Sequence, residues 1–507
     1  MFKPQMIPPM TEATRSRPDQ PKTAVVVGGG LAGAAAATIL AERGVSVVLL
    51  EREPVLGGRV SGWTDRLDDG EPFEMERGFH AFFRQYYNLR GLLRRFDPAL
   101  QRLTPLTDYP ILGPGGAIET FRGLSRLPIV NVAQLVWRTS YLKIVDLWRA
   151  DVRQATAMLT YDRNHTYGRF DRQTASAYLD SLRFPPQARR MLFDVFSHSF
   201  FNPEAEMSAG ELLMMFHFYF IGNPEGLIFD VLNESFSDAL WRPWQRYLER
   251  YQVAIHTRTE VDGLERTNGD GWRVNIKPGG NIAGDAVVLA VNVPALREIV
   301  GRSVGLNDEP WQAGVRDLAL TYPFTVWRIW LDRNVRPDRA PFVGTAGLGL
   351  IDNISVYELF EGESRRHFLR TGGSVLELHA YAVPPQLDET AIRTELLNRL
   401  HELYPETREA KIVEERFMLR QDCPAFAPGS DYTRPTVETP FPGLALCGDF
   451  VRLPLPSALM EKAATSGIMA ANHLLNRWHV RGEEIWSVPH QGVLSSLGPK
   501  LFPVTTG

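Results

Sequence analysis

Residues 23–51 read TAVVVGGGLAGAAAATILAERGVSVVLLE. The apolar run at 24–27 predicts a strand, the alanine-rich run after the glycines predicts a helix, and residues 45–50 predict a second strand. Gly28, Gly30 and Gly33 have the spacing in which the first glycine makes a turn, the second lets the backbone approach a pyrophosphate and the third lets the helix pack on the strand. The helix N-terminus then faces the phosphates. This pattern predicts a dinucleotide-binding unit.

Glu51 closes this unit at the end of the second strand. Its carboxylate is placed to accept hydrogen bonds from a ribose 2′-hydroxyl, and it would repel a phosphate there. We also expect Leu31, Ala32 and Arg52 to contact the dinucleotide. The pattern by itself does not separate NAD from FAD.

The bulk properties of the chain exclude several classes of protein. Its 507 residues are 44% hydrophobic, enough for two or three domains or one large interleaved domain, and the net charge of −4 does not indicate nucleic-acid binding. Two cysteines, Cys423 and Cys447, are too few for a disulfide framework or a zinc or iron–sulfur site, so we expect no metal and a reducing cytoplasm. No apolar run reaches the ~18 residues that cross a bilayer. Residues 1–21 hold five prolines and no hydrophobic signal core, which predicts a disordered leader.

A glycine pair followed by arginine, Gly57, Gly58 and Arg59, comes shortly after Glu51. The glycines let the backbone approach a second phosphate-bearing part of the ligand, and the arginine can add charge-assisted hydrogen bonds. The alternative is an ordinary glycine turn with a solvated arginine. The first interpretation favours FAD over NAD.

Residues 443–475 form a second cofactor element. A strand at 444–447 leads to Gly448 and Asp449, whose carboxylate suits a ribityl hydroxyl, and Ser457 is a predicted N-cap. The helix that follows begins near Ala458 and Leu459, and its positive end would stabilise a reduced, anionic flavin by about 0.3 to 1 kcal/mol. We expect Val261 to complete the site. No second GxGxxG is available for NAD, so we predict FAD.

Residues 73–98 are rich in aromatic side chains. Gly78 would allow close approach to a flat ring, beside a predicted aromatic wall of Phe79, Phe82, Phe83, Tyr86 and Tyr87. His80 is either a packed, hydrogen-bonded group or a catalytic one. Arg77 and Glu461 are the other catalytic candidates near the flavin, and a structural role at the start of its helix is the alternative for Glu461.

The fingerprint together with Gly57-Gly58-Arg59 resembles the FAD-dependent amine oxidases and carotenoid desaturases. The run RGFHAFFRQYYNL at 77–89 is similar to the carotenoid branch, in particular to the bacterial carotenoid ring desaturase/methyltransferases of the isorenieratene-synthase type. Acyclic desaturases usually have small residues where Arg84 stands, which favours the ring enzymes. Some ring-aromatising members carry a Rieske segment, whose Cys/His pairs this chain lacks.

The resemblance implies an α/β fold, with a Rossmann-like FAD-binding domain interleaved with an α+β substrate domain, as in amine oxidases and phytoene desaturases. It implies an FAD-dependent oxidoreductase that desaturates a lipophilic carotenoid and aromatises its β-ring. Oxidation next to the gem-dimethyl carbon would give a cation, a methyl would shift to the neighbouring carbon, and further hydrogen loss would give the arene. No S-adenosylmethionine is needed for this route.

The chain order predicts a discontinuous cofactor domain at 22–107, 230–300 and 412–478, and a substrate and membrane-facing domain at 108–229 and 301–411. The tail at 479–507 has no assigned role. A helical region at 132–162 mixes aromatic and basic residues, so it is either a surface helix or a helix lying on anionic lipid. Phe- and Met-rich runs at 193–201 and 212–221 are either core or the lining of a tunnel for a polyene.

Three alternatives remain open: an acyclic carotenoid desaturase, an amine oxidase, and a non-catalytic carrier on the same fold, such as the GDP-dissociation inhibitors. The sequence does not name the electron acceptor, and both oxygen and a quinone are candidates. We expect a cytoplasmic protein bound peripherally to the inner face of the cell membrane.

Overall fold

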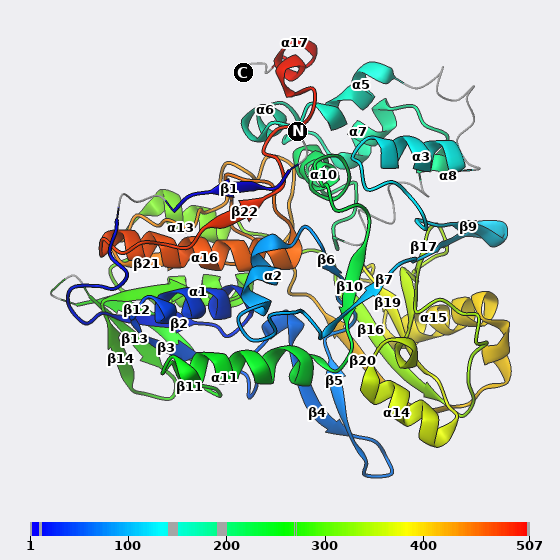
Figure 1. Cartoon of the computed structure of the whole chain (residues 1–507), viewed down its shortest axis with the longest axis horizontal. Coiled ribbons are helices and arrows are strands. Elements are labelled where there is room, and N and C mark those ends of the chain that lie inside the picture. Colours follow the sequence, from blue (N-terminus) through cyan, green and yellow to red (C-terminus); the bar gives the residue numbers. More distant parts are fainter. Residues whose placement is uncertain are drawn as a thin grey trace.

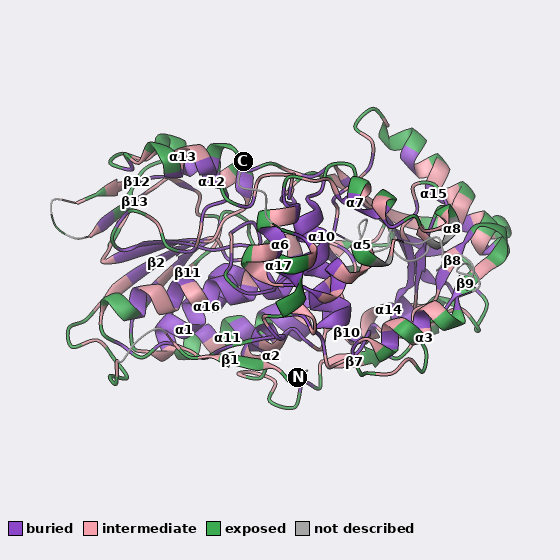
Figure 2. Cartoon of the chain, turned by 90° about the horizontal axis from the view of Figure 1, so that it is seen from above, coloured by how far each residue is buried: buried purple, intermediate pink, exposed green. Residues whose placement is uncertain are grey.

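The computed structural model describes residues 3–9, 13–139, 151–189, 200–267, 269 and 271–503. Figure 1 shows a cofactor-side part on the left, a second sheet with its helices at the lower right, and a group of helices above them. Figure 2 shows that helices α1, α16 and α10 in the middle are largely buried, whereas α3, α13 and α15 at the rim carry exposed residues. Within the described residues, no helix is both long and apolar enough to cross a membrane.

A parallel five-stranded sheet forms the cofactor side. Its order is β11-β3-β2-β15-β21, and every neighbouring pair is parallel. The three predicted strands are confirmed as β2 (Thr23–Val27), β3 (Ser46–Leu50) and β21 (Leu444–Leu446), and the sheet is completed by β11 (Ala254–His256) and β15 (Ala286–Leu289). Both β15 and β21 are buried along their whole length, as expected for parallel strands covered on both faces.

Two helices rich in small residues, α1 (Leu31–Glu42) and α16 (Leu459–Arg477), cover one face of this sheet and pack against each other. At Gly467 a Cβ atom would lie 2.2 Å from the carbonyl oxygen of Ala32 and 2.9 Å from the Cβ of Ala35. The small side chains therefore set the distance between the helices. Helix α16 carries the flavin-side element and α1 the pyrophosphate-side element, so this contact holds the two together.

The second sheet has seven strands in the order β20-β16-β19-β18-β17-β8-β9 and is antiparallel except between β8 and β17. The strands are β8 (Ile111–Gly113), β9 (Ala117–Glu119), β16 (Phe324–Leu331), β17 (Phe342–Thr345), β18 (Asn353–Val356), β19 (Val375–Ala380) and β20 (Ile412–Arg420). Helices α14 (Gly362–Thr371) and α15 (Glu389–Leu403) belong to this part. One predicted boundary is wrong: β20 begins at residue 412 but pairs with β16 of the second sheet.

Shorter elements connect the two sheets. The pair β4 (Gly62–Arg66) and β5 (Pro72–Glu76) leads to a three-stranded sheet of β6 (Phe82–Phe83), β10 (Phe229–Leu232) and β7 (Leu103–Leu106). On the cofactor side lie α2 (Tyr87–Leu93), α11 (Arg242–Arg250), β12 (Val261–Arg266), β13 (Trp272–Ile276), β14 (Asn281–Gly284), α12 (Val293–Arg302) and α13 (Glu309–Arg316).

Within the described residues, the helical group includes α3 (Val130–Arg138), α5 (Val152–Thr156), α6 (Arg163–Phe170), α7 (Ala175–Ser181), α8 (Pro186–Arg189) and α10 (Ala209–Phe216). A π-helical turn, His217–Ile221, extends α10. The helix predicted at 132–162 starts as α3, but Thr139 has extended backbone and ends it. Tyr141, Lys143, Trp148 and Arg149 of that prediction, like residues 193–199, lie outside the described residues.

The prediction that the leader at 1–21 is disordered is wrong for the part that the structure describes. Strand β1 (Gln5–Ile7) pairs antiparallel with β22 (Ile485–Ser487) of the C-terminal tail, and Figure 1 shows the two side by side above α16. The composition of the leader did not reveal this pairing because its partner lies about 480 residues away in sequence.

The contact between α1 and α16 can be tested with two glycines that sit inside helices. Gly467→Ala should lower the unfolding temperature, because its methyl meets the Ala32 carbonyl and overpacking costs about 1 to 3 kcal/mol. Gly301→Ala in α12 should raise that temperature slightly, because a Cβ there meets nothing within 4 Å and alanine favours the helix by about 1 kcal/mol. Thermal unfolding of both variants checks this, and stabilisation by Gly467→Ala would contradict it.

Candidate active site

A single cavity of about 850 Å³ extends from the carboxyl ends of the parallel strands to the second sheet. Most of the predicted cofactor residues line it: Gly28, Gly30, Leu31, Ala32, Glu51, Arg52, Gly58, Arg59, Phe79, Val261, Gly448, Asp449 and Leu459. Of the catalytic candidates, Arg77 and His80 line it as well. Gly33, Gly78, Ala458 and Glu461 are not on its wall.

The three glycines of the fingerprint play different parts. Gly28 has a φ of +106°, and a Cβ there would lie 2.6 Å from the Ala290 carbonyl oxygen. A Cβ at Gly33 would lie 1.9 Å from the Gly28 carbonyl oxygen, so this position serves helix–strand packing, as predicted. At Gly30 the nearest atom to a Cβ is the Gly57 carbonyl oxygen, at 3.8 Å, so the space above Gly30 belongs to the cavity. It is the cradle that a pyrophosphate requires.

Glu51 lies at one end of the cavity with its carboxylate buried. One carboxylate oxygen accepts the Gly29 N–H at 2.7 Å and the other accepts the Glu53 N–H at 2.8 Å. Burial raises the pKa of Glu51, while these two backbone hydrogen bonds act in the opposite direction. Each oxygen keeps a second lone pair with which it could accept a ribose hydroxyl.

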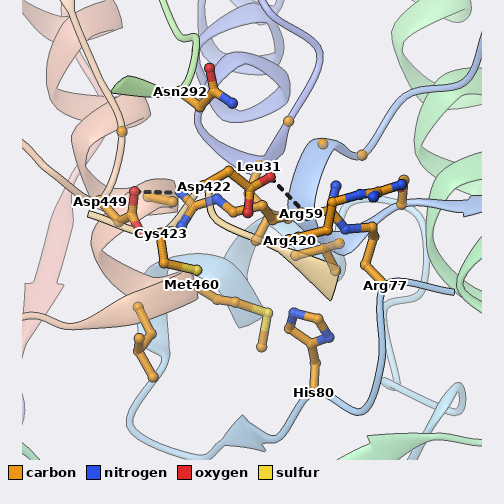
Figure 3. Close-up of a pocket in the computed structure, with 18 of the residues that line it drawn as sticks. Leu31, Arg59, Arg77, His80, Asn292, Arg420, Asp422, Cys423, Asp449 and Met460 are labelled. Carbon is orange, nitrogen blue, oxygen red and sulfur yellow. Dashed lines mark hydrogen bonds and ion pairs between the residues drawn. The ribbon is translucent and has the colours of Figure 1, made fainter. Parts of the chain in front are cut away.

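Two ion pairs form a charged belt across the middle of the cavity (Figure 3). Arg59 binds both oxygens of Asp449, at 2.8 and 2.5 Å, and Arg77 donates to Asp422 at 2.7 Å. Arg59 is therefore paired, and the alternative of a solvated arginine is wrong. Cys423 lies near both pairs, and burial raises the pKa of its thiol to about 11, so it stays a neutral thiol.

Gly78 meets protein, not the cavity. It has a φ of +101°, and a Cβ there would lie 2.8 Å from His379 Cε1 and 2.9 Å from Val326. The predicted approach to a flat ring is replaced by an approach to the second sheet. The next residue, Phe79, donates its N–H to the Glu377 carboxylate of β19 at 2.9 Å, so the loop is fixed to this sheet.

Glu461 is not aimed at the cavity, and the structure favours its structural role. Its carboxylate accepts the Asn88 N–H at 2.9 Å, the Asn88 side-chain amide at 2.8 Å and the Leu89 N–H at 3.0 Å. These donors lie in the first turn of α2, so Glu461 caps that helix. Burial raises the pKa of Glu461 to about 8 despite the three donors.

The start of α16 differs from the prediction. The N-cap is Ala458, which makes no side-chain cap, and Leu459 has a φ of +49°. The buried Ser457 hydroxyl, expected to cap the helix, has no hydrogen-bond partner in the described part of the chain. The helix N-terminus still reaches the cavity, through Leu459, Met460 and Ala463.

The half of the cavity beyond the charged belt is aromatic. Phe79 stacks on Phe342 with ring centroids 4.4 Å apart and meets Phe229 edge-on at 5.9 Å. Of the predicted aromatic wall, Phe79, Phe83 and Tyr86 line the cavity, whereas Phe82 is core and Tyr87 is not on the wall. The sequence interpretation missed the lining residues Tyr109, Phe121, Phe229, Phe342, His379, Tyr381 and Met460. The only signal for Phe229 was its place in an apolar run.

Arg84, which favoured the ring enzymes in the sequence comparison, also lies off the wall. Its guanidinium is 3.6 Å from the buried Asp230 of β10, which binds Arg90 at 2.6 Å. The two arginines therefore balance the charge of one buried carboxylate and hold β10 against the segment that follows β6.

The fold and this cavity define a flavin-dependent oxidoreductase built around a dinucleotide-binding sheet. The family model described as flavin containing amine oxidoreductase matches residues 31–475, and the chain belongs to this family. A carotenoid phi-ring synthase of Streptomyces griseus is 48% identical over 487 residues, covering 96% of this chain and 94% of that protein. A zeta-carotene desaturase of Synechocystis is 25% identical and covers 89% and 96%.

Solved structures agree on the fold. Putrescine oxidase with bound putrescine has a TM-score of 0.66 at 15% identity, covering 90% of this chain and 100% of that one. Cyclohexylamine oxidase from Brevibacterium oxydans has a TM-score of 0.64 at 14% identity, covering 90% and 99%. FAD is the cofactor, and the residues fit it: Gly30 and Gly58 leave room for phosphates, Arg59 and Asp449 offer charge to the phosphates and ribityl hydroxyls, and Glu51 stands at the ribose end.

The cradle at Gly30 can be tested without disturbing the packing. Gly30→Val should fold normally, because its φ of −77° suits valine and no atom lies within 3.4 Å of the new Cβ. The side chain would fill the space needed by the pyrophosphate, so the purified variant should contain less than about a tenth of the flavin found in the wild type. Flavin absorbance and thermal unfolding check this, and normal flavin content would contradict it.

Proposed function

We propose that this FAD-dependent oxidoreductase desaturates a carotenoid and aromatises its β-ring, with a 1,2-methyl shift, as in the conversion of β-carotene to isorenieratene. The observation that carries the proposal is the division of the cavity into a charged end and an aromatic end. Phosphates and hydroxyls fit the first, whereas a hydrocarbon ring fits the second, where Phe79, Phe229 and Phe342 meet. The name of the relative with 48% identity supports the same substrate class.

The flavin, when bound, supplies the hydride acceptor that desaturation needs. The protein does the rest. The stacked aromatic side chains hold the ring and exclude water, and their π-faces stabilise a positive charge on it by about 0.5 to 2 kcal/mol. In each of the pairs Arg59–Asp449 and Arg77–Asp422, the two side chains neutralise each other's charge. These two pairs therefore present little net charge to a developing cation.

The alternatives fit the cavity less well. An amine oxidase needs a compact polar pocket, but the described cavity has an apolar lining beyond the charged belt. A non-catalytic carrier would not need Arg59, Asp449 and the close-packed start of α16 at one site. An acyclic polyene is the closer rival, because it is equally apolar.

The substrate can be tested in a β-carotene-producing host. We expect the wild-type chain to convert β-carotene into pigments with one and then two aromatic rings, identified by chromatography and mass, with a loss of four hydrogens per ring. Gly30→Val, which we expect to retain little flavin, should leave β-carotene largely unchanged. Consumption of lycopene or another acyclic polyene while β-carotene persists would overturn the ring-aromatising proposal.

We also propose that the protein docks peripherally on the cytoplasmic face of the membrane, where its lipophilic substrate is dissolved. Exposed apolar side chains gather around α3: Leu127 is 62% exposed and Trp137 is 80% exposed, with Val130 between them. Arg122, Arg126 and Arg138 in the same segment are exposed and basic. This combination suits anionic lipid. A membrane quinone would then be a reachable electron acceptor, and anaerobic turnover with added quinone distinguishes it from oxygen.

Membrane docking can be tested by flotation with anionic vesicles. Leu127→Glu combined with Trp137→Glu should weaken vesicle binding at least about tenfold, since two apolar anchors of roughly 1.5 to 3 kcal/mol each are replaced by charges that anionic lipid repels. Leu369→Glu on α14, where the leucine is 72% exposed, is the matched control and should bind as the wild type does. Equal binding by the double variant would contradict docking through α3.

A further inference from the structure

His80 has a fixed tautomer. Its Nδ1 atom lies 2.7 Å from the carbonyl oxygen of Gly78. A carbonyl oxygen only accepts hydrogen bonds, so Nδ1 carries the hydrogen, and in the neutral ring Nε2 then holds a lone pair. The imidazole of His80 is thus set up as a proton acceptor at Nε2.

The open nitrogen belongs to a ring on the cavity wall. His80 lines the cavity, and Figure 3 shows its ring extending from the loop toward the side chain of Met460 at the start of α16. No hydrogen-bond partner of Nε2 occurs among the residues that the structure describes. Phe236 meets the ring edge-on at 5.5 Å and fixes its plane. Burial, with His379 and Arg77 nearby, lowers the pKa of His80 to about 4, so the ring is neutral at physiological pH.

Other basic groups on the wall near the charged belt and the aromatic end are engaged. His379 uses Nδ1 toward the Tyr381 hydroxyl at 2.8 Å and Nε2 toward the Glu377 carboxylate at 2.7 Å. Asp422 and Asp449 are paired with arginines, and Glu51 accepts two backbone N–H groups far along the cavity. Asp352 accepts the Tyr381 N–H at 2.5 Å. Of these groups, only His80 has a ring nitrogen on the cavity wall that is without a hydrogen-bond partner in the described part of the chain.

We propose that Nε2 of His80 is the base that removes the proton released when the ring becomes a diene and then an arene. The proposal rests on the proposed function and assigns a residue to its proton step. A hydride leaves the ring carbon next to the gem-dimethyl carbon, with the oxidised flavin as acceptor. One methyl then migrates with its bonding pair onto that carbon, and the positive charge moves to the former gem-dimethyl carbon.

The proton step balances this change. The carbon that received the methyl loses its hydrogen as a proton to Nε2, and the C–H electron pair becomes the new ring double bond. Once the electron acceptor, a quinone or oxygen, has reoxidised the flavin, a second loss of one hydride and one proton completes the arene, four hydrogens in all. A C–H bond beside a carbocation is strongly acidic, so a weakly basic imidazole suffices. Its low pKa also keeps it unprotonated before each turnover and lets it pass the proton to water afterwards.

Two substitutions separate the base from the loop structure. His80→Asn keeps a side-chain N–H that can donate to the Gly78 carbonyl and removes Nε2 as a base. It should lower the rate of aromatisation per bound flavin by about 10² to 10⁴-fold, with flavin content and unfolding temperature unchanged. His80→Ala should be equally slow and should regain rate on addition of imidazole, in proportion to the unprotonated form.

A buried histidine elsewhere provides the control. His217 also has a pKa lowered to about 4 by burial, but its Nε2 bonds to the Pro489 carbonyl and it is off the cavity. His217→Asn should keep the wild-type rate per flavin, whatever its effect on stability. If His80→Asn stays within about fivefold of the wild type, or if imidazole fails to rescue His80→Ala, the assignment of the base is overturned.

Failure of the proposed function would look different. If the wild type leaves β-carotene unchanged but consumes another polyene, the substrate proposal falls, and the same variants are compared on that polyene. A readout independent of turnover is the nitrogen NMR spectrum of histidine-labelled protein, in which the His80 signal is the one missing in His80→Asn. A ring protonated at Nδ1 and unchanged from pH 8 down to pH 5 supports the base. A ring protonated at Nε2, or one that titrates near pH 6.5, overturns it.

Discussion

The buried ion pair between Arg328 and Glu377 is the interaction on which the arrangement of the cavity depends. The two side chains are 3% and 0% exposed, their charged atoms are 2.9 Å apart, and Glu76 of β5 lies 3.4 Å from the same guanidinium. Arg328 and Glu377 lie on β16 and β19 of the second sheet, whereas Glu76 lies on β5, the strand that leads into the loop of His80. The guanidinium of Arg328 therefore joins the second sheet to this loop. Removing one partner of such a pair costs about 3 to 5 kcal/mol, since it leaves a buried charge unpaired. The arginine holds the pKa of Glu377 at about 2, so the carboxylate stays ionised and accepts the Phe79 N–H.

Features that depend only on neighbouring residues in the chain could be predicted from the sequence. The parallel strands, the packing glycine Gly33 and the open cradle at Gly30 follow from residue spacing and from the lack of a Cβ, and both are local properties. The family resemblance, carried by residues 77–89 and the glycine motifs, added the cofactor and the substrate class.

Contacts between distant residues could not be predicted in this way. Glu461 looked like a catalytic acid from its place in α16, but its role depends on Asn88, more than 370 residues earlier. Serine is a favoured N-cap residue, yet the N-cap of α16 is the next residue, Ala458. Phe342 stands near the start of β17, and nothing in its neighbours indicates that it stacks on Phe79. Each case is decided by which surfaces meet, and no single segment encodes that.

The segment Gly78–His80 links the Arg328–Glu377 ion pair to the proposed base. Glu377 holds the N–H of Phe79, and the contact of Gly78 with His379 and Val326 admits no side chain, so the backbone between them has little freedom. The Gly78 carbonyl is therefore fixed, and it is this carbonyl that takes the Nδ1 hydrogen of His80. A buried charge pair in the second sheet thus determines which nitrogen of one imidazole is left as a base. The aromatic lining therefore lies beside a neutral proton acceptor, Nε2 of His80. This suits the proposed reaction, whose intermediates are cations and whose substrate has no polar group to bind.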